Sequence, residues 1–392
     1  MTHLERLAEL AVVVGANVQP GQVVQVTAEV EQIEVLRAVT DAAYRHGARF
    51  VDAQLRAPVL QRSLVINRPA QAYVPTWADA STYGLDAAAG ARIMLIGPST
   101  PGLLDDLDPV LVDRAQPPRS RAWREVEYRV NNTIIPGPHQ AWAQSRYPQL
   151  TAGQALENLW QDIAIACRLD DEDPVANWRR RFADLSDRAH QLSAMGLDAI
   201  RLGGPGTDLL VGLLPGVQWA GPTNISERGV LHAWNLPSEE IYTSPDPARV
   251  NGHVRLTRPA VVGGTIVNDV TLRFVNGDVS EIAGGGGVDG LRAFASRDAG
   301  TRRVGALVDA DSAVAHVDRP FGLGLLDENT AAHLALGFGF PQLANKQTRA
   351  RVNQSGDHLD LTIGSPDLQI TGLDCFGGSE RALMRDGRWA LL

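Results

Sequence analysis

The sequence predicts an α/β N-terminal domain with a mainly parallel sheet, followed by an α+β C-terminal domain rich in antiparallel strands. Three observations support this fold class. The chain has 392 residues, enough for about two domains of ordinary size. As far as about residue 135, short apolar segments alternate with helical patterns, which is typical of a parallel sheet covered by helices. From residue 197 onward, the pattern changes to strands and hairpins.

The N-terminal domain is expected to span residues 1–150. Thr2 and Glu5 have the spacing of a capping box, which predicts that a helix begins at the N-terminus. Prolines between Pro136 and Pro148 indicate the end of this domain. Its elements are predicted as helices at 2–16 and 31–47 and strands at 23–27, 49–53 and 91–97.

Two helices, at 151–169 and 174–195, are predicted to connect the domains over residues 151–195. The C-terminal domain then spans residues 196–392. Within it, Asn276-Gly277-Asp278 lies between two apolar segments and predicts a β-hairpin. Short helices are expected at 288–296 and 328–337.

Composition and charge exclude several classes of function. The 36 basic and 45 acidic residues give a net charge of −9, which argues against a nucleic-acid partner. No apolar run approaches the roughly 18 residues that span a membrane, and the N-terminus does not resemble a secretory signal. The two cysteines, Cys167 and Cys375, cannot form a disulfide framework or a thiolate metal site. A reduced, cytoplasmic protein is therefore expected.

Two glycine-rich segments do not carry nucleotide-binding motifs. Residues 284–287 lack the Lys-Ser/Thr of a phosphate loop, and Gly204-Pro205-Gly206 lacks the third glycine of a dinucleotide fingerprint. We interpret both as turns, so no nucleotide cofactor is expected.

The segment 357–363 is the best candidate for chemistry. Strand alternation would place His358, Asp360 and Thr362 on one face. An imidazole and a carboxylate on one strand face can bind the same metal ion or form a structural hydrogen-bonded pair. Considered alone, His333 is interpreted as an interior residue of the predicted 328–337 helix. Glu240, considered alone, is interpreted as a surface carboxylate.

Three ordered motifs give the chain a resemblance to a known family. They are NLPSEEIYTSP at 235–245, LDEN with HLALG at 326–337, and NQS with HLD at 353–360 followed by Gly364. From about Leu4 to Trp389 the chain resembles the thermophilic-type metalloaminopeptidases, the family of aminopeptidases T, S and II. The resemblance implies a homodimeric hydrolase with two divalent ions in the C-terminal domain, and zinc, cobalt or manganese would suit its ligands.

By this resemblance, Glu240, His333, His358 and Asp360 fall on metal ligands, and Glu240 is also catalytic. The implied reaction releases N-terminal residues from peptides, or cleaves a related small amide, through metal-activated water.

The sequence departs from the family at two positions. Where the family carries a further glutamate ligand, Gly300-Thr301-Arg302-Arg303-Val304-Gly305 leads into Ala306. Asp309 and Asp311 are the nearest acidic residues and therefore possible additional ligands. Phe340 stands where the family places a tyrosine, and a phenyl ring can neither bind a cation nor donate a hydrogen bond.

Extra histidines occur at His232, His253 and His316, and His232 is close enough in sequence to Asn235 to be a further possible ligand. Three hypotheses follow. The first is the metalloaminopeptidase-like hydrolase. The second is a mononuclear iron(II) ring-opening dioxygenase that binds its metal through His333, His358 and Asp360. The third is a repurposed, non-catalytic homologue that keeps the dimer and a binding cavity.

Overall fold

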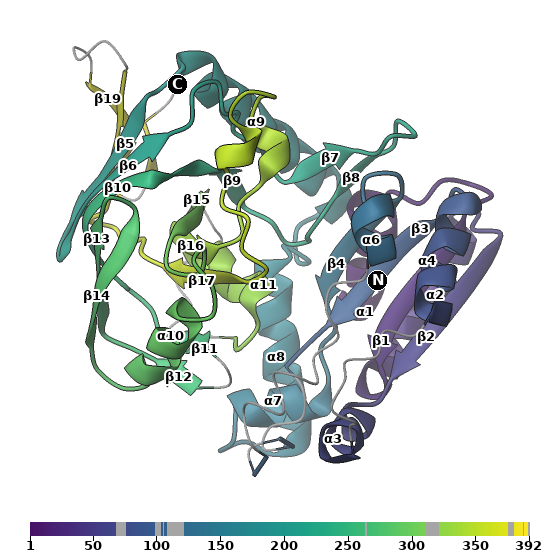
Figure 1. Ribbon diagram of the computed structural model, residues 1–392. Helices are drawn as coiled ribbons and strands as arrows, with labels where there is room; N and C mark the ends of the chain where they lie inside the picture. The colour runs from purple at the N-terminus through teal and green to yellow at the C-terminus, as the bar shows by residue number, and fades with distance from the viewer. Residues whose placement is uncertain are drawn as a thin grey trace. The chain divides into compact units, whose positions relative to one another are not determined.

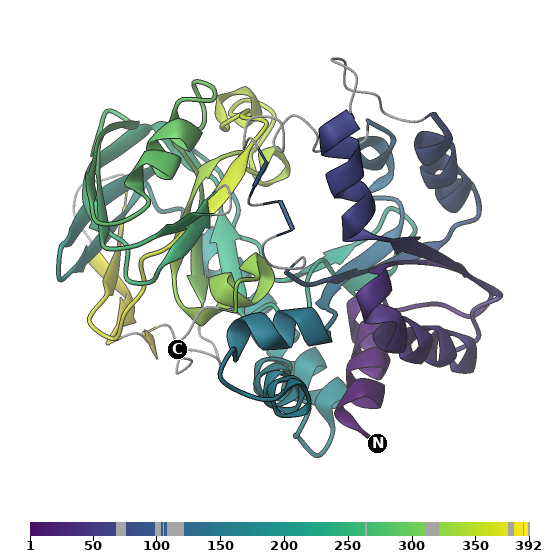
Figure 2. The same cartoon turned by 90° about the horizontal axis from the view of Figure 1, so that it is seen from below.

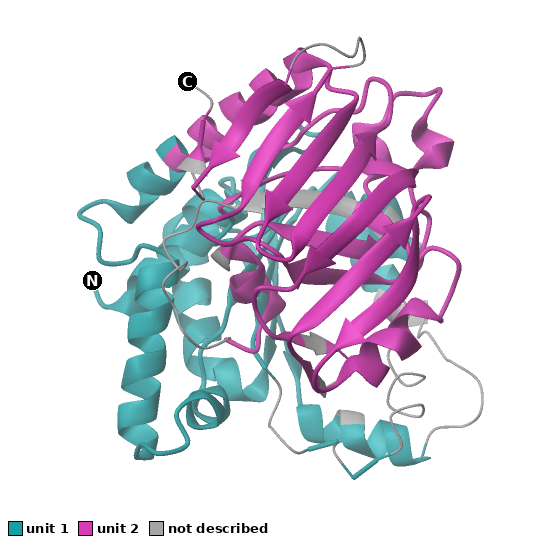
Figure 3. Ribbon diagram, turned by 90° about the vertical axis from the view of Figure 1, so that its left-hand side faces the viewer, with its two compact units in different colours: residues 1–180, 223–238 teal, residues 181–222, 239–392 magenta. Residues whose placement is uncertain are grey.

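The computed structural model describes most of the chain as two compact units. The described residues are 1–67, 76–98, 103–104, 106–107, 121–262, 265–310, 321–374, 380–386 and 388–390. One unit comprises residues 1–180 and 223–238, and the other comprises residues 181–222 and 239–392 (Figure 3). The two units are defined by which residues pack together. The domain boundaries predicted from the sequence, after residues 150 and 195, remain predictions.

The N-terminal unit contains the predicted parallel sheet (Figure 1). Its strand order is β2-β1-β3-β4, and Val26 at its centre is in register with Ala53 on one side and Ile93 on the other. Helices lie on both faces of this sheet, which Figure 2 shows nearly edge-on. The strands are β1 (Val23–Glu29), β2 (Phe50–Arg56), β3 (Ala91–Ile96) and β4 (Asn131–Pro136), and a separate pair is formed by β7 (Thr223–Ile225) and β8 (Leu231–Ala233).

The helices predicted at 2–16, 31–47, 151–169 and 174–195 are present. The Thr2 side chain accepts a hydrogen bond from the Glu5 amide at 3.2 Å, and the Glu5 carboxylate accepts one from the Thr2 amide at 2.8 Å, so the predicted capping box is present. The helices are α1 (His3–Leu10), a π-helical turn (Ala11–Gly15), α2 (Ile33–Arg45), α3 (Pro58–Asn67), α4 (Thr76–Ala87), α6 (Arg121–Val126), α7 (Gln140–Arg146), α8 (Ala152–Ala166) and α9 (Pro174–Met195), whose last part belongs to the second unit. Of these, α3, α4, α6 and α7 are not among the helices predicted from the sequence.

Strand β4 is a difference from the sequence prediction, which places no strand at residues 131–136. Its first two residues, Asn131 and Asn132, are polar, and they are buried because their side chains donate hydrogen bonds to backbone carbonyls. Asn131, for example, donates to the Ala16 carbonyl at 2.6 Å. A Cβ at Gly15 would lie 2.8 Å from the hydroxyl of Thr133, so a glycine allows the first helix to approach this strand closely. Cys167, which follows the last residue of α8, is buried.

The C-terminal unit is built mainly from antiparallel strands, as predicted. Its large sheet has the order β14-β13-β10-β6-β5-β18-β19-β20. The predicted hairpin joins β13 to β14, where Asn276 and Gly277 adopt positive φ angles of 49° and 89°. The strands are β5 (Ala199–Gly204), β6 (Thr207–Leu213), β10 (Pro245–Arg255), β13 (Val270–Val275), β14 (Asp278–Gly284), β18 (Gln369–Leu373), β19 (Glu380–Arg385) and β20 (Arg388–Trp389).

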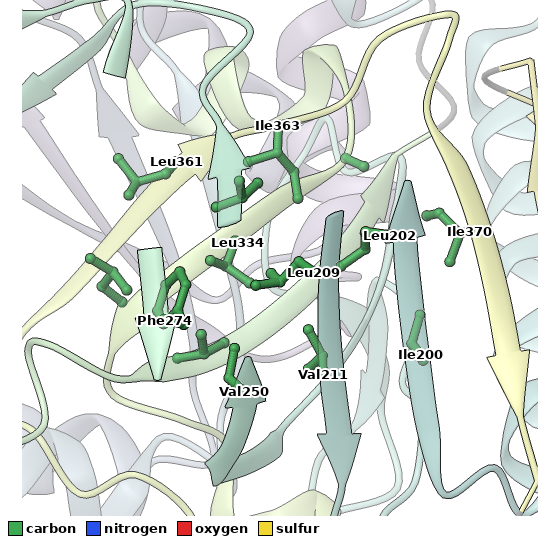
Figure 4. Close-up of a cluster of buried hydrophobic side chains, with 14 of the residues drawn as sticks. Ile200, Leu202, Leu209, Val211, Val250, Phe274, Leu334, Leu361, Ile363 and Ile370 are labelled. Carbon is green, nitrogen blue, oxygen red and sulfur yellow. The ribbon is translucent and has the colours of Figure 1, made fainter. Parts of the chain in front are cut away.

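A second sheet of four strands, in the order β17-β16-β15-β9, packs against the large one. Leu334 and Leu361 from this sheet meet Leu209, Val211 and Phe274 from the large sheet in one apolar core (Figure 4). The small sheet therefore buries one face in this core. Its strands are β9 (Glu240–Thr243), β15 (Val304–Ala310), β16 (His333–Gly337) and β17 (His358–Thr362).

The remaining elements of this unit are short. They are β11 (Ala260–Val262), β12 (Thr265–Val267), α10 (Val288–Ala295), α11 (Gly324–Asp327) and 3₁₀ turns at Glu328–Thr330, Pro341–Leu343 and Arg349–Arg351. The helix expected at 288–296 is confirmed by α10. Across the residues the structure describes, no helix is both long enough and apolar enough to cross a membrane.

The helix predicted at 328–337 is wrong. The Glu328–Thr330 segment forms one 3₁₀ turn, and His333–Gly337 is strand β16. The Ala- and Leu-rich composition favours a helix locally. In the folded chain β16 pairs on one side with β15 and on the other with β17, and this pairing overrides the local preference.

Candidate metal centre

The register of the small sheet brings the four predicted ligands to its second face. His333 is in register with Thr362, and Asp360 with Ala335. Because side chains alternate along a strand and directly paired residues point the same way, His333, His358 and Asp360 share a face. Position 308 of β15 is in register with His333 on one side and with Tyr242 of the edge strand β9 on the other. Glu240, two positions away, lies on that same face.

The donor atoms of these side chains are close to one another. His333 Nε2 lies 3.6 Å from Asp360 Oδ1 and 3.8 Å from Glu240 Oε2, and His358 Nε2 lies 3.2 Å from Asp360 Oδ1. Two donors that share a tetrahedral ion at about 2.0–2.2 Å are separated by about 3.3–3.6 Å. Within the described part of the chain, however, no three His, Cys, Asp or Glu side chains are already arranged to hold an ion. The three donor pairs have residue types and distances that suit a shared ion, although the full ligand set is not yet formed among the described residues. An ion bound here would replace the contact between His358 and Asp360.

Burial and neighbouring charges act in opposite directions on His358 and Asp360. Burial lowers the pKa of His358, but the carboxylate of Asp360 outweighs burial and the pKa is raised. Burial in turn raises the pKa of Asp360, and His358 and His333 outweigh it, so the pKa of this carboxyl is lowered. His358 Nδ1 lies 2.8 Å from the Phe338 carbonyl, which fixes a proton on Nδ1 and leaves Nε2 as the donor to a metal.

Glu328 is a member of this group that the sequence analysis did not assign. It lies in the 3₁₀ turn before β16, and burial raises the pKa of its carboxyl well above the usual value. The negative charges of Glu240 and Asp360 act in the same direction. A divalent cation bound here would offset the charges of carboxylates that otherwise repel one another. The signal was present in the LDEN motif, but only the folded chain shows which of its acidic residues faces the other ligands.

Asn329 connects the chain segments that carry Glu240 and Glu328. Its side-chain oxygen accepts a hydrogen bond of 2.6 Å from the Glu239 amide, and its side-chain nitrogen donates one of 2.6 Å to the Leu325 carbonyl. Asn329 and Glu239 are each only 1% exposed, and the Glu239 carboxylate also pairs with Arg181 at 2.7 Å. The buried Asn329 side chain, next to Glu328 in sequence, is thus bonded to the backbone of Glu239, next to Glu240.

We expect Asn329→Ala to weaken the binding of a divalent ion by about 10-fold or more, because loss of a residue that orients metal ligands has an effect of this size. Stability should also fall by roughly 1–3 kcal/mol, because two buried backbone groups lose their partner. Asn131→Ala is the matched control. Asn131 is 2% exposed and donates a 2.6 Å hydrogen bond to a backbone carbonyl, but it lies in the other unit. A comparable loss of metal affinity in both variants would mean that Asn329 acts only through stability.

The other residues considered as ligands lie in different parts of the chain. Asp309 lies on β15 in register with Ile241, while its neighbour at 310 is in register with Glu240. Asp311 and His316 lie outside the described residues. His253 is an exposed residue of β10 in the large sheet. His232 is buried in the N-terminal unit with its Nδ1 2.8 Å from the Asn132 carbonyl. Ligand roles for Asp309, Asp311 and His232 remain predictions.

Position 306 is in register with Ala335, which is in register with Asp360. Ala306→Glu would therefore add a carboxylate in the row of a predicted ligand. We expect this variant to bind a second ion more tightly than the natural chain, because a further anionic ligand offsets the repulsion between two cations. The measurement is the number of zinc or cobalt ions bound per chain in a titration. An unchanged stoichiometry and affinity would show that position 306 does not face the metals.

Comparison with known proteins now identifies the class of protein. Residues 1–389 match the family model for thermophilic metalloproteases (M29), and the chain belongs to this family. It is 35% identical to aminopeptidase T of Thermus thermophilus over 99% of this chain and 98% of that protein. Aminopeptidase 2 of Geobacillus stearothermophilus is 33% identical over the same shares. The solved structure of wild-type AmpT from Thermus thermophilus has a TM-score of 0.91 and 34% identity, with 99% of each chain covered.

These findings confirm the predicted resemblance, the fold class and the expectation of a metal-dependent hydrolase. They give no support to the ring-opening dioxygenase. They do not assign individual metal ligands.

Proposed function

We propose that this chain is an aminopeptidase that removes the N-terminal residue of peptides with the help of divalent metal ions bound by Glu240, Glu328, His333, His358 and Asp360. One observation carries the proposal: imidazole and carboxylate groups from three strands lie 3.2–3.8 Å apart on one face of the small sheet. Burial raises the pKa of Glu328, in the turn before β16, and the charges of Glu240 and Asp360 raise it further. The aminopeptidase names of the relatives support the choice of substrate.

When bound, a divalent ion of this kind polarises the peptide carbonyl and activates a water molecule for attack. The side chains supply the other functions. The Glu240 carboxylate accepts a proton from the water and returns it to the leaving nitrogen. The Phe338 carbonyl holds the His358 ring in place. A free N-terminal amine has a lone pair that is available to a bound ion, whereas the nitrogen of a blocked N-terminus does not.

Carboxylate and imidazole ligands suit zinc, cobalt or manganese.

We further propose that the protein is a homodimer, as the family resemblance implies. Light scattering can test this oligomeric state. We place the protein in the cytoplasm. This location is consistent with Cys167, a free and buried thiol whose pKa burial raises.

The test compares two peptides that differ only in their N-terminus. The protein is loaded with zinc, cobalt or manganese and incubated with a short apolar peptide that is either free or acetylated. We expect release of the first residue from the free peptide only, and loss of the activity when a chelator removes the metal. Equal cleavage of both peptides would contradict an aminopeptidase, and no cleavage by any metal form would favour the repurposed homologue.

A further inference from the structure

Tyr242 lies on the same face of the small sheet as the proposed ligands. It follows Glu240 by two positions on β9, and through position 308 it shares a row with His333. Side chains at alternate positions of a strand point to the same side, so the phenol extends from the face that carries the carboxylates and imidazoles. The residue is half-buried.

Tyr242 belongs to an aromatic group that borders His358. Its ring centroid lies 4.8 Å from that of Phe340, and the Phe340 centroid lies 5.9 Å from that of His358. Ala335 is fully buried and packs against Tyr242 and Phe340. Ala335 is also in register with Asp360. The two rings are therefore next to the ligand group, over a small residue that leaves room for them.

The proposed reaction develops negative charge that a hydrogen-bond donor beside the ligands would stabilise. When the water oxygen bonds to the carbonyl carbon, the π electron pair moves to the carbonyl oxygen, which becomes an oxyanion. In the second step the C–N bond breaks, the carbonyl re-forms and the nitrogen takes the proton. Phe340 has no group that donates a hydrogen bond, whereas the Tyr242 hydroxyl is a neutral donor near pH 7.

We propose that the Tyr242 hydroxyl donates the hydrogen bond that stabilises this oxyanion. The inference rests on the proposed function, since it assigns a catalytic residue within the same site. The phenol keeps its proton throughout, so the balance of the hydrolysis is unchanged. Removal of one donor of this type reduces kcat by about 10²–10³-fold in enzymes where it has been measured.

The first experiment measures Tyr242→Phe in the metal-loaded protein. We expect kcat for release of an N-terminal residue to fall by about 10²–10³-fold, with metal content and KM little changed. Affinity for an α-aminophosphonate peptide analogue, whose phosphonate oxygens mimic the oxyanion, should also fall, while affinity for the free amino acid product should stay the same. Tyr44→Phe is the control, because it removes a hydroxyl that accepts from the Val51 amide in the N-terminal unit.

The second experiment moves the hydroxyl to the neighbouring ring. Because the rings of Tyr242 and Phe340 are in contact, the double variant Tyr242→Phe with Phe340→Tyr keeps both rings and returns one hydroxyl to this group. We expect kcat to recover by at least about 10-fold over the single variant, as one donor regained would allow. No recovery in a double variant with normal metal content would indicate that Tyr242 only packs, and would overturn the inference.

Failure of the inference can be told from failure of the proposed function. If the natural chain is an active aminopeptidase and Tyr242→Phe keeps its kcat and its phosphonate affinity, the inference is wrong and the function stands. If the metal-loaded natural chain releases no N-terminal residue, the proposed function is wrong and the role of Tyr242 falls with it.

Discussion

His358→Ala and Asp360→Ala are each expected to abolish metal-dependent peptidase activity and leave the fold intact. The two side chains lie on one strand with their donor atoms 3.2 Å apart, and Asp360 is also close to His333. Loss of a residue that merely orients a ligand weakens metal binding by about 10–100-fold, so loss of a ligand should exceed about 100-fold. The measurement is metal affinity by competition with a coloured chelator, together with activity.

The fold should survive because the apolar contacts of this strand come from its other face. Leu361 is fully buried in the core between the two sheets and is unaffected by either change. Asp357→Asn is a suitable control. It removes a carboxylate just before His358 whose partner, Arg297, forms an exposed ion pair that contributes little to stability. Wild-type metal affinity in His358→Ala or Asp360→Ala would contradict the assignment of the site.

Glu328→Gln is expected to change metal binding and stability in opposite directions. Without metal, the natural chain has Glu328 partly buried beside the charges of Glu240, Asp360 and Asp327. Replacing it with a neutral isostere removes this repulsion, so the metal-free protein should become more stable. Metal affinity should fall by about 10-fold or more, because one anionic ligand is lost. Thermal unfolding with and without added zinc measures both effects.

The neighbouring carboxylate provides a contrasting control. Asp327 accepts hydrogen bonds from the amides of Phe321 and Leu323 at 2.6 and 3.1 Å, which is a structural role. Asp327→Asn should therefore destabilise the metal-free protein. If Glu328→Gln behaved like Asp327→Asn, with lower stability and unchanged metal affinity, Glu328 would be a structural residue and not a ligand.

Much of the fold follows from local patterns in the sequence. Alternation along 357–363 predicts that His358 and Asp360 share a strand face, and β17 confirms it. The Asn-Gly turn and the helix at 174–195 are likewise present where their signals predict them. These features depend on a short window of residues, and contacts with distant parts of the chain do not change them.

The errors arise where a distant part of the chain decides the local structure. His333 lies in a segment that favours a helix, and only pairing with β15 and β17 makes it a strand. Strand β4 begins with polar residues that become buried because other segments supply their hydrogen bonds. Glu328 stands in the LDEN motif, and nothing in its sequence neighbourhood indicates that the charges of Glu240 and Asp360 act on it. Such contacts between distant residues cannot be read from spacing.

The most direct test of the account is to count the metal ions bound per chain. The protein is purified without chelator, dialysed against zinc, cobalt or manganese, and analysed for its elements beside the Asp360→Ala variant. The account predicts at least one such ion per natural chain and a large loss in the variant. A natural chain that retains no divalent ion after reconstitution, or a variant that retains as many as the natural chain, would contradict it.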